Sequence, residues 1–225
     1  MSAGQSKARR GPPKAFDIEA ALDAAMLVFW QKGFDGASLS DLTEAMAINR
    51  PSLYATFGDK QALFRRAIDR FSDLGRAMFA ESAAQATARL FAQRLLRGQA
   101  ELYSNPRLAP GCFLIQSAIS ASTATQAARQ AAADRRLVNE LAVRQHLQRA
   151  DRIQQLPQGI PAREMAGYLT SVGNGLAIRA ADGARRQELY RIVDLALAFW
   201  PVITAEPPKR AARKSPRAKA SKTIA

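Results

Sequence analysis

Residues 38–60 read SLSDLTEAMAINRPSLYATFGDK, and this stretch predicts two short helices joined by a tight turn. Ser38 can cap the first helix, and Asp41 lies three residues further on, where it completes a capping box. An apolar stripe at helical spacing follows the cap and consists of Leu39, Leu42 and Met46. The first helix therefore packs one face against a core and ends at a break over residues 47–49.

The second helix of the stretch follows this break. Asn49 can cap it, and Pro51 is tolerated in the first turn, where its missing N–H would have no partner in any case. Leu53 and Phe57 are four residues apart, so they share an inward face. The opposite face is small and polar with one aromatic side chain. Such a face can lie in a DNA major groove and present side chains to base edges.

Together with its flanks, the stretch resembles the helix-turn-helix of the TetR family of bacterial transcriptional regulators. The matching segments are FWQKGF at 29–34, ASLSDLTEAMAI at 37–48, NRPSLYATF at 49–57 and GDKQALF at 58–64. The resemblance covers about residues 16–71. Because four consecutive elements match, it is far more specific than an isolated short motif.

The resemblance implies an all-α fold with an N-terminal three-helix DNA-binding domain at 15–75, whose helix-turn-helix spans about 39–58. It implies a C-terminal helical bundle at 76–204 for ligand binding and dimerisation. The partners implied are a double-stranded DNA operator and a second copy of the chain. The mechanism implied is that of a repressor, in which a small molecule in the bundle shifts the fourth helix and weakens operator binding.

The resemblance also implies roles for particular residues in DNA binding. The positions that face DNA in the family are occupied here by Arg50, Pro51, Ser52, Tyr54 and Thr56. Positions that hold the phosphate backbone are occupied by Ser38, Ser40 and Lys60. Backbone contacts position the protein on the duplex, whereas base contacts supply specificity.

Composition agrees with a helical protein that has an anionic partner. The chain has 225 residues, 48% of them hydrophobic, which suffices for one or two domains with a sizeable core. Alanine is abundant and strand-like alternation is scarce, so an all-helical fold is favoured. The net charge of +14 and the pI near 10.8 indicate an anionic binding partner, with nucleic acid favoured over an anionic membrane.

The positive charge is concentrated at the two ends of the chain. Residues 1–14 carry +4 and predict a flexible basic arm, which either contacts a minor groove or is simply solvated. Residues 206–225 carry +6, and 205–225 predict a disordered basic tail. Subtracting the charges of these two ends from the net charge of +14 leaves +4 for the rest of the chain. The tail raises an alternative function, that of a nonspecific or architectural DNA-binding protein whose affinity depends steeply on salt.

Periodicity and breaks predict the remaining helices. Asp17 begins a first helix that runs to about Lys32 with Gly33 as its C-cap, and Trp30 and Phe34 are expected in the core. The later helices are expected at 59–82, 84–103, 112–125, 126–152, 162–181 and 184–203.

The chemistry of catalysis is missing from the sequence. A single histidine, His146, and a single cysteine, Cys112, leave no His/Cys metal cluster, so we expect no metal, no cofactor and no enzyme activity. Gly173 and Gly175 lack the strand and the third glycine of a dinucleotide-binding motif. One cysteine allows no intrachain disulfide. The first 25 residues lack the apolar core of a signal peptide, and no stretch of 18 apolar residues could span a membrane. We therefore expect a bacterial cytoplasmic protein that is not in a membrane and joins the nucleoid when bound to DNA.

The expected effector is an apolar or aromatic small molecule. Candidate pocket residues by position are Tyr103, Phe113, Gln116, Ser117, Ser120, His146 and Tyr168, each equally compatible with ordinary packing. Cys112 follows Pro110 and Gly111 at an expected helix start, where a thiolate would be stabilised and a redox sensor is conceivable. The favoured interpretation is a buried, inert thiol.

Overall fold

The computed structural model describes residues 16–119, 126–153, 155–198 and 200, and its regular elements are all helices. The helices are α1 (Ile18–Gly36), α2 (Leu39–Ala45), α3 (Arg50–Phe57), α4 (Lys60–Ala83), α5 (Ala88–Tyr103), α6 (Phe113–Ile119), α7 (Gln126–Asp151), α8 (Ala162–Ala181) and α9 (Arg186–Ala196). The all-α prediction is confirmed. The predicted basic arm at 1–14 and basic tail at 205–225 lie outside the described residues.

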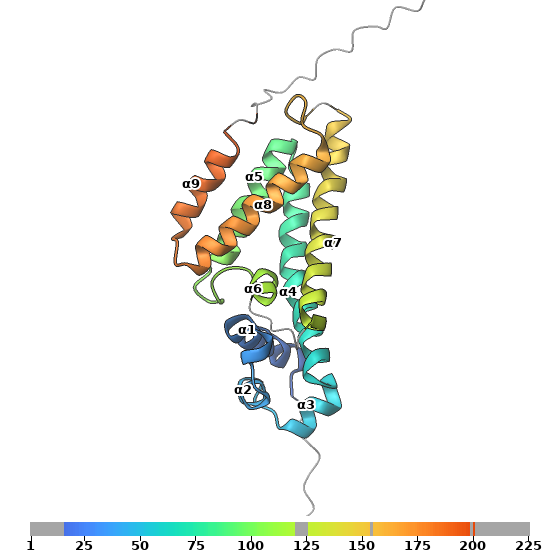
Figure 1. The fold of residues 1–225 in the computed structure, drawn as a ribbon, viewed down its shortest axis with the longest axis vertical. Helices are drawn as coiled ribbons and strands as arrows, with labels where there is room; N and C mark the ends of the chain where they lie inside the picture. The colour runs from blue at the N-terminus through green and yellow to red at the C-terminus, as the bar shows by residue number, and fades with distance from the viewer. Residues whose placement is uncertain (1–15, 120–125, 154, 199, 201–225) are drawn as a thin grey trace, which may run out of the picture.

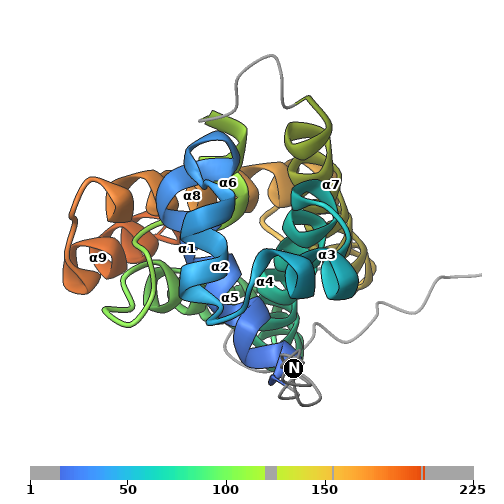
Figure 2. The same cartoon turned by 90° about the horizontal axis from the view of Figure 1, so that it is seen from below.

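The molecule is elongated, with α1, α2 and α3 at one end and the longer helices forming the body (Figure 1). Viewed onto that end, α2 and α3 lie nearest the viewer (Figure 2). The helix α4 runs unbroken from the small end into the body, so it crosses the predicted domain boundary at residue 75. That boundary therefore stays a prediction.

Local signals account for the start of the first helix and for its irregular end. The carboxylate of Asp17 accepts hydrogen bonds from the N–H groups of Glu19 and Ala20, as expected of an N-cap. Gly33 adopts φ 70°, which glycine tolerates without steric cost. The helix is kinked at this expected C-cap and continues to Gly36, four residues beyond the expected end at Lys32.

A cluster of aromatic rings joins the small end to the body. The ring of Phe113, on α6, is fully buried and lies 5.5 Å from the ring of Phe64 and 5.8 Å from that of Phe71, both on α4. Both pairs are near-perpendicular, which is a favoured aromatic geometry. Trp30 and Phe34 of α1 complete the cluster, which confirms that they belong to the core.

Polar side chains tie α9 to the rest of the body. Arg97 of α5 donates to Asp194 at 2.8 Å and lies over the Tyr190 ring at 5.0 Å. The Tyr190 hydroxyl in turn donates to Glu101 at 2.9 Å. These exposed and half-exposed contacts fix the position of α9 more than they stabilise the fold.

Three of the later expected helices differ from the observed ones. The helix expected at 84–103 is α5, which begins only at Ala88, after the cap at Thr87. The helix expected at 112–125 is α6, and residues 120–125 lie outside the described part of the chain. The helix expected at 184–203 is α9, which ends at Ala196. Beyond it, Trp200 is buried and its indole N–H donates to the Gln155 carbonyl at 3.2 Å. Trp200 also precedes a proline, a position that disfavours helical backbone, so the chain turns here.

We predict that Phe113→Ala destabilises the protein by about 3–5 kcal/mol, because it removes a fully buried ring and leaves a cavity. Urea unfolding followed by circular dichroism measures the change. Leu137→Ala is the matched control, since Leu137 is 57% exposed on α7 and its truncation should change stability by less than about 0.5 kcal/mol. Equal unfolding midpoints for the two variants would contradict the structural role of the ring.

Candidate nucleic-acid interface and internal cavities

The start of α2 is fixed by a complete capping box. The Ser38 hydroxyl accepts a hydrogen bond from the Asp41 N–H at 3.0 Å, and the Asp41 carboxylate accepts from the Ser38 N–H at 2.9 Å. Lys32 donates to the same carboxylate at 2.7 Å. The Lys32 hydrogen bond, followed by those from Ser38, lowers the pKa of Asp41 to about 2. The carboxylate is therefore ionised at neutral pH and holds α2 against α1.

The turn between α2 and α3 depends on an uncommon backbone conformation. Ala47 has φ 52°, in the left-handed region that side chains with a Cβ seldom adopt. The Ile48 N–H donates to the Thr43 carbonyl at 3.1 Å, which closes the turn. The predicted break at residues 47–49 is therefore confirmed, and it sets the angle between the two helices.

The helix α3 presents one face to the core and the other to solvent. Asn49 caps it by accepting from the Ser52 N–H at 2.8 Å. Leu53 and Phe57 are buried, as predicted, whereas Tyr54 is 49% exposed. The outer face is thus free to meet another molecule, while the inner face fixes the orientation of the helix.

The side chain of Arg50 connects α3 with α2. Its Nη2 donates to the Ser40 hydroxyl at 2.9 Å, and both residues are exposed. A guanidinium has five N–H donors, so this single hydrogen bond leaves most of them available. The pair therefore positions Arg50 at the surface without using up its capacity to bind acceptors.

The start of α4 adds a lysine to the same surface. Asp59 caps the helix, and the Nζ of Lys60 lies 4.6 Å from the centroid of the Phe34 ring. Burial lowers the pKa of Lys60, and the opposite charge of Asp35 counteracts part of this effect. Further along α4, the guanidinium of Arg66 lies over the Phe57 ring and donates to the Thr56 carbonyl at 3.3 Å.

The residues expected to contact DNA all lie on α2, α3 and the adjoining helix starts. Five are exposed, namely Ser38, Ser40, Arg50, Pro51 and Tyr54. Three are half-buried, namely Ser52, Thr56 and Lys60. The sequence reasoning missed Lys32, whose salt bridge to Asp41 supports this surface. No local signal identifies that partner, because the two residues belong to different helices.

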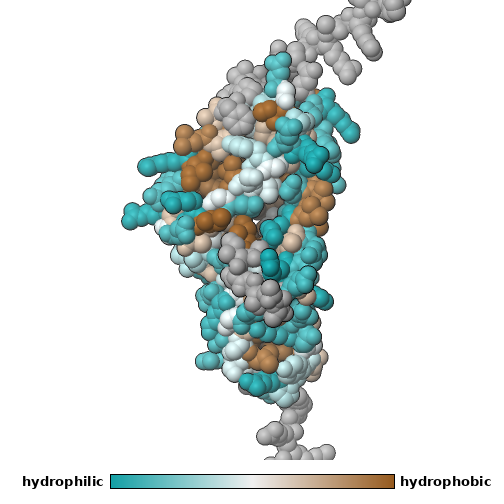
Figure 3. Space-filling view, in the orientation of Figure 1, coloured by the Kyte–Doolittle hydropathy of each residue, from teal (hydrophilic) through white to brown (hydrophobic). Residues whose placement is uncertain are grey.

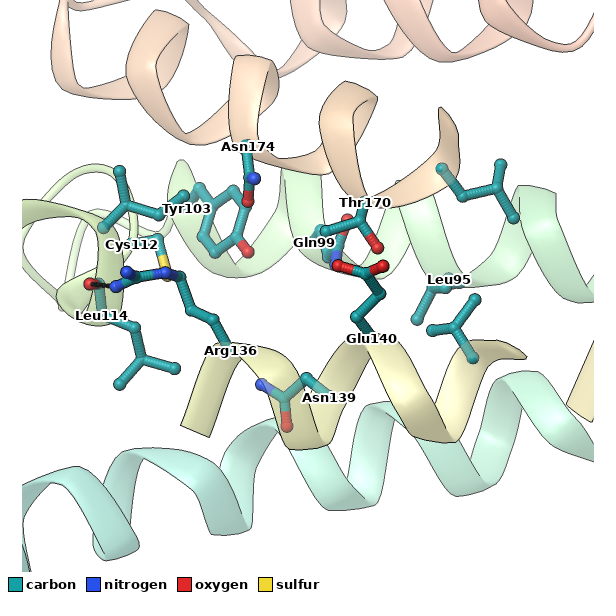
Figure 4. A pocket seen from close by; sticks show the side chains of 13 residues that line it. Leu95, Gln99, Tyr103, Cys112, Leu114, Arg136, Asn139, Glu140, Thr170 and Asn174 are labelled. Atoms are coloured by element: carbon teal, nitrogen blue, oxygen red, sulfur yellow. Dashed lines mark hydrogen bonds between the residues drawn. The ribbon is translucent and has the colours of Figure 1, made fainter. Parts of the chain in front are cut away.

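Two cavities lie inside the body and share part of their walls. The larger, about 250 Å³, is bounded mainly by α4, α5 and α7 and is largely apolar, with Phe71, Met78 and Phe79 among its walls. The smaller, about 80 Å³, lies between α5, α7 and α8 (Figure 4). Its polar walls come from Gln99, Arg136, Asn139, Glu140, Thr170 and Asn174. Most of these wall residues were not predicted, since helical periodicity does not distinguish a packed face from a cavity wall.

Tyr103 is the expected pocket residue that lines both cavities. Gln116 lies outside these walls, and its side-chain amide donates to the Pro110 carbonyl at 2.7 Å. The ring of His146 stacks on Phe91 with 4.0 Å between centroids. Burial and the nearby Arg149 lower the pKa of His146, which favours a neutral packing residue.

The other expected pocket residues serve packing or lie elsewhere. Phe113 belongs to the aromatic cluster, and the buried Ser117 hydroxyl donates to the Phe113 carbonyl at 2.7 Å. The Tyr168 hydroxyl donates to the Ala196 carbonyl at 2.7 Å, between α8 and the end of α9. Ser120 lies outside the described residues. Phe113, Ser117 and Tyr168 are not among the walls of the two cavities.

Cys112 lines both cavities and is buried. Burial raises the pKa of its thiol, and this outweighs the opposing hydrogen bonds from the backbone of Ile115 and Leu114 and from the Tyr103 hydroxyl. A protonated thiol is a poor nucleophile. The structure thus agrees with the interpretation of Cys112 as an inert, buried side chain.

Comparison with known proteins adds independent findings. A family model described as bacterial regulatory proteins of the tetR family matches residues 21–67. The transcriptional repressor ComR of Escherichia coli is 33% identical over 202 residues, which cover 87% of this chain and 94% of ComR. The chain belongs to the TetR family. The recognition made from the four sequence segments is therefore confirmed, and the protein is a helix-turn-helix transcriptional regulator.

Solved structures of other family members have the same fold. A cysteine mutant of the TetR family regulator CifR, in complex with double-stranded operator DNA, is 34% identical, with a TM-score of 0.79 over 84% of this chain and all of CifR. The BdcR repressor of Escherichia coli is 46% identical over 61 residues, which cover 27% of this chain and 31% of BdcR. The whole-length matches support an N-terminal helix-turn-helix followed by a helical ligand-binding body.

The described ranges contain neither a metal cluster nor a membrane-spanning helix. Between residues 16 and 200, leaving aside the undescribed positions, no group of three or more His, Cys, Asp or Glu side chains could hold a metal ion. In the same part of the chain, no helix has the length and apolar character needed to cross a bilayer.

We predict that iodoacetamide alkylates native Cys112 slowly at about pH 7. The rate should rise about tenfold per pH unit up to about pH 9 without levelling, because the thiolate fraction grows this way below a raised pKa. Mass spectrometry measures the rate without ambiguity, since the chain has one cysteine. The urea-unfolded chain is the control and should react faster throughout. A native rate above the unfolded rate near pH 7 would favour the sensor interpretation.

Proposed function

We propose that this protein is a sequence-specific repressor that binds an operator as a homodimer and is released by a small apolar or aromatic molecule. The observation that carries the proposal is the outer face of α3, where Arg50 and Tyr54 are exposed while Leu53 and Phe57 lock the inner face. The relative ComR is named a repressor, and CifR has been solved with operator DNA. Both proteins match this chain over most of its length.

In the proposed complex, α3 lies in the major groove and the two flanking helix starts hold the phosphates. Arg50, Pro51, Ser52, Tyr54 and Thr56 are the candidates for contact with bases and the adjacent backbone. The exposed hydroxyls of Ser38 and Ser40 and the ammonium of Lys60 suit phosphate oxygens. The bond between Arg50 and Ser40 would be exchanged for bonds to DNA.

Release by a ligand is supported by the proximity of the cavities to the aromatic cluster. Cys112 and Leu114 line both cavities, and Phe113 between them inserts its ring against α4. The helix α4 itself supplies Phe71, Met78 and Phe79 to the larger cavity. A ligand that binds one arrangement of α4 and α6 more tightly than another would thereby change the spacing of two recognition helices in a dimer.

Dimerisation through α8 and α9 is supported by apolar side chains on their outer faces. Figure 3 shows hydrophobic side chains gathered over these helices. Ile178 is 47% exposed and Leu195 is 75% exposed. Val193, by contrast, is fully buried within its own chain, so a charge there would disturb the fold rather than the interface. A two-fold dimer would match a pseudo-palindromic operator and a cytoplasmic regulator.

We predict that Arg50→Ala and Tyr54→Ala each weaken operator binding by about 1–3 kcal/mol, because each removes a contact made by the exposed face of α3. Gel-shift titrations on a fragment of the protein's own promoter region, located by footprinting, measure the loss. Thermal stability should stay close to that of the unmodified protein, since both side chains are exposed.

Arg163→Ala is the matched control for Arg50→Ala. It removes the same charge from an exposed position on α8, far along the chain from the helix-turn-helix, and should leave operator affinity unchanged. Affinity for random DNA is measured in parallel. Equal affinity of the unmodified protein for operator and random DNA would instead support the alternative of a nonspecific DNA-binding protein.

We predict that Leu195→Glu converts the dimer into monomers, because a charge would replace the most exposed large apolar side chain among the described residues. Light scattering at micromolar concentration measures the mass. Leu137→Glu, at an exposed position on α7, is the control, and this variant should remain dimeric. An unmodified protein that is monomeric under these conditions would refute the assembly.

A further inference from the structure

The charged side chains that line the two cavities are unequally paired. Arg76 is paired with Asp73, and Arg135 is paired with Asp69. Arg136 donates through Nη1 to the Leu114 carbonyl at 2.7 Å. The three cationic side chains in these walls therefore each have an acceptor within the protein.

The carboxylate of Glu140 is the exception in these walls. It lines the smaller cavity, and no residue in the described part of the chain forms an ion pair or a hydrogen bond with it. Arg136 lies four positions earlier on α7, where a partner could stand, but its guanidinium is turned toward α6 (Figure 4). Beside Gln99 the unpaired charge is therefore negative, whereas the guanidinium of Arg136, bonded to a neutral carbonyl, lies at the α6 end of the cavity (Figure 4).

A second acceptor without a partner lies in the same cavity. The side-chain oxygen of Gln99, Oε1, is buried and receives no hydrogen bond. It is pressed against α8, since a Cβ at Gly173 would lie 2.4 Å from it. A buried acceptor that is left unpaired costs stability, so a donor from outside the chain would be favoured here.

Building on the proposed release by a small molecule, we propose that the effector carries a protonated amine on an apolar or aromatic body. The ammonium binds the carboxylate of Glu140, beside the side-chain amide of Gln99 (Figure 4). The apolar body extends into the larger cavity, against Phe71 and Phe79. An ammonium has three donors and no acceptor, which complements two unpaired acceptors.

The charged groups in the walls of the smaller cavity disfavour a carboxylic acid of equal size at the same place. An acid would lie near the unpaired carboxylate of Glu140 and would find the guanidinium of Arg136 already bonded to α6. Arg136 could bind the acid through its remaining N–H donors at the α6 end of the cavity, but the carboxylate of Glu140 would still lack a partner. The end of the cavity at Glu140 therefore favours a positive charge over a negative one.

Three probes with one skeleton test the proposal, namely phenylbutylamine, phenylbutanol and phenylbutyrate. Isothermal titration calorimetry on the full chain should show saturable binding of the amine, at least about tenfold tighter than of the acid. Glu140→Gln, which keeps the size of the side chain, should weaken amine binding by about tenfold or more and leave the alcohol unchanged. Glu164→Gln, at an exposed position on α8, is the matched control and should bind the amine as the unmodified protein does.

Circular dichroism melting establishes that Glu140→Gln is folded, and a gel shift with each probe separates this inference from the proposed function. Amine binding that depends on Glu140 supports the ligand class even if the operator stays bound, in which case the release mechanism fails. No saturable amine binding, equal binding of the acid, or an unchanged amine affinity in folded Glu140→Gln would overturn the ligand class. Release of DNA by the alcohol or the acid but not by the amine would also overturn the ligand class. The proposed function as a ligand-released repressor would then still stand.

Discussion

The insertion of the Phe113 ring between α1 and α4 is the contact on which the arrangement of the molecule depends. The ring meets Trp30, Phe64 and Phe71 and excludes solvent completely. It is the point at which the short helix α6, the helix-turn-helix and the long helix α4 share one packed cluster. Because packed interiors transmit displacement rather than absorb it, movement on one side of this ring has to be accommodated on the other.

The residues on either side of Phe113 in the sequence connect the aromatic cluster with the cavities. Cys112 and Leu114 flank the ring in sequence and face the cavities, and the Leu114 carbonyl is held by Arg136 from α7. A single turn of helix thus has one side chain in the DNA-binding end and its neighbours in the body. The cavity and the aromatic cluster lie on opposite sides of the same backbone, which is a compact basis for coupling two sites.

The DNA-binding end is rigid for a different, more local reason. Each of its helices begins with a side-chain cap, from Asp17, Ser38, Asn49 and Asp59 in turn. The turn at Ala47 and the bond between Arg50 and Ser40 then fix α3 relative to α2. The recognition surface can therefore move as one body, which suits regulation by a change in the spacing of two such bodies rather than by deformation of each.

The sequence by itself determined the caps, the turn, the inward positions of Leu53 and Phe57 and the exposed face around Tyr54, because these follow from interactions within four residues along the chain. It also determined the family, through four consecutive matching segments. Only the tertiary structure decided that Phe113 fills an aromatic cluster instead of a pocket, that α9 ends where Trp200 reaches Gln155, and that Glu140 and Gln99 face a cavity. These outcomes depend on which helices become neighbours, and helical periodicity marks an inward face without naming what lies opposite it.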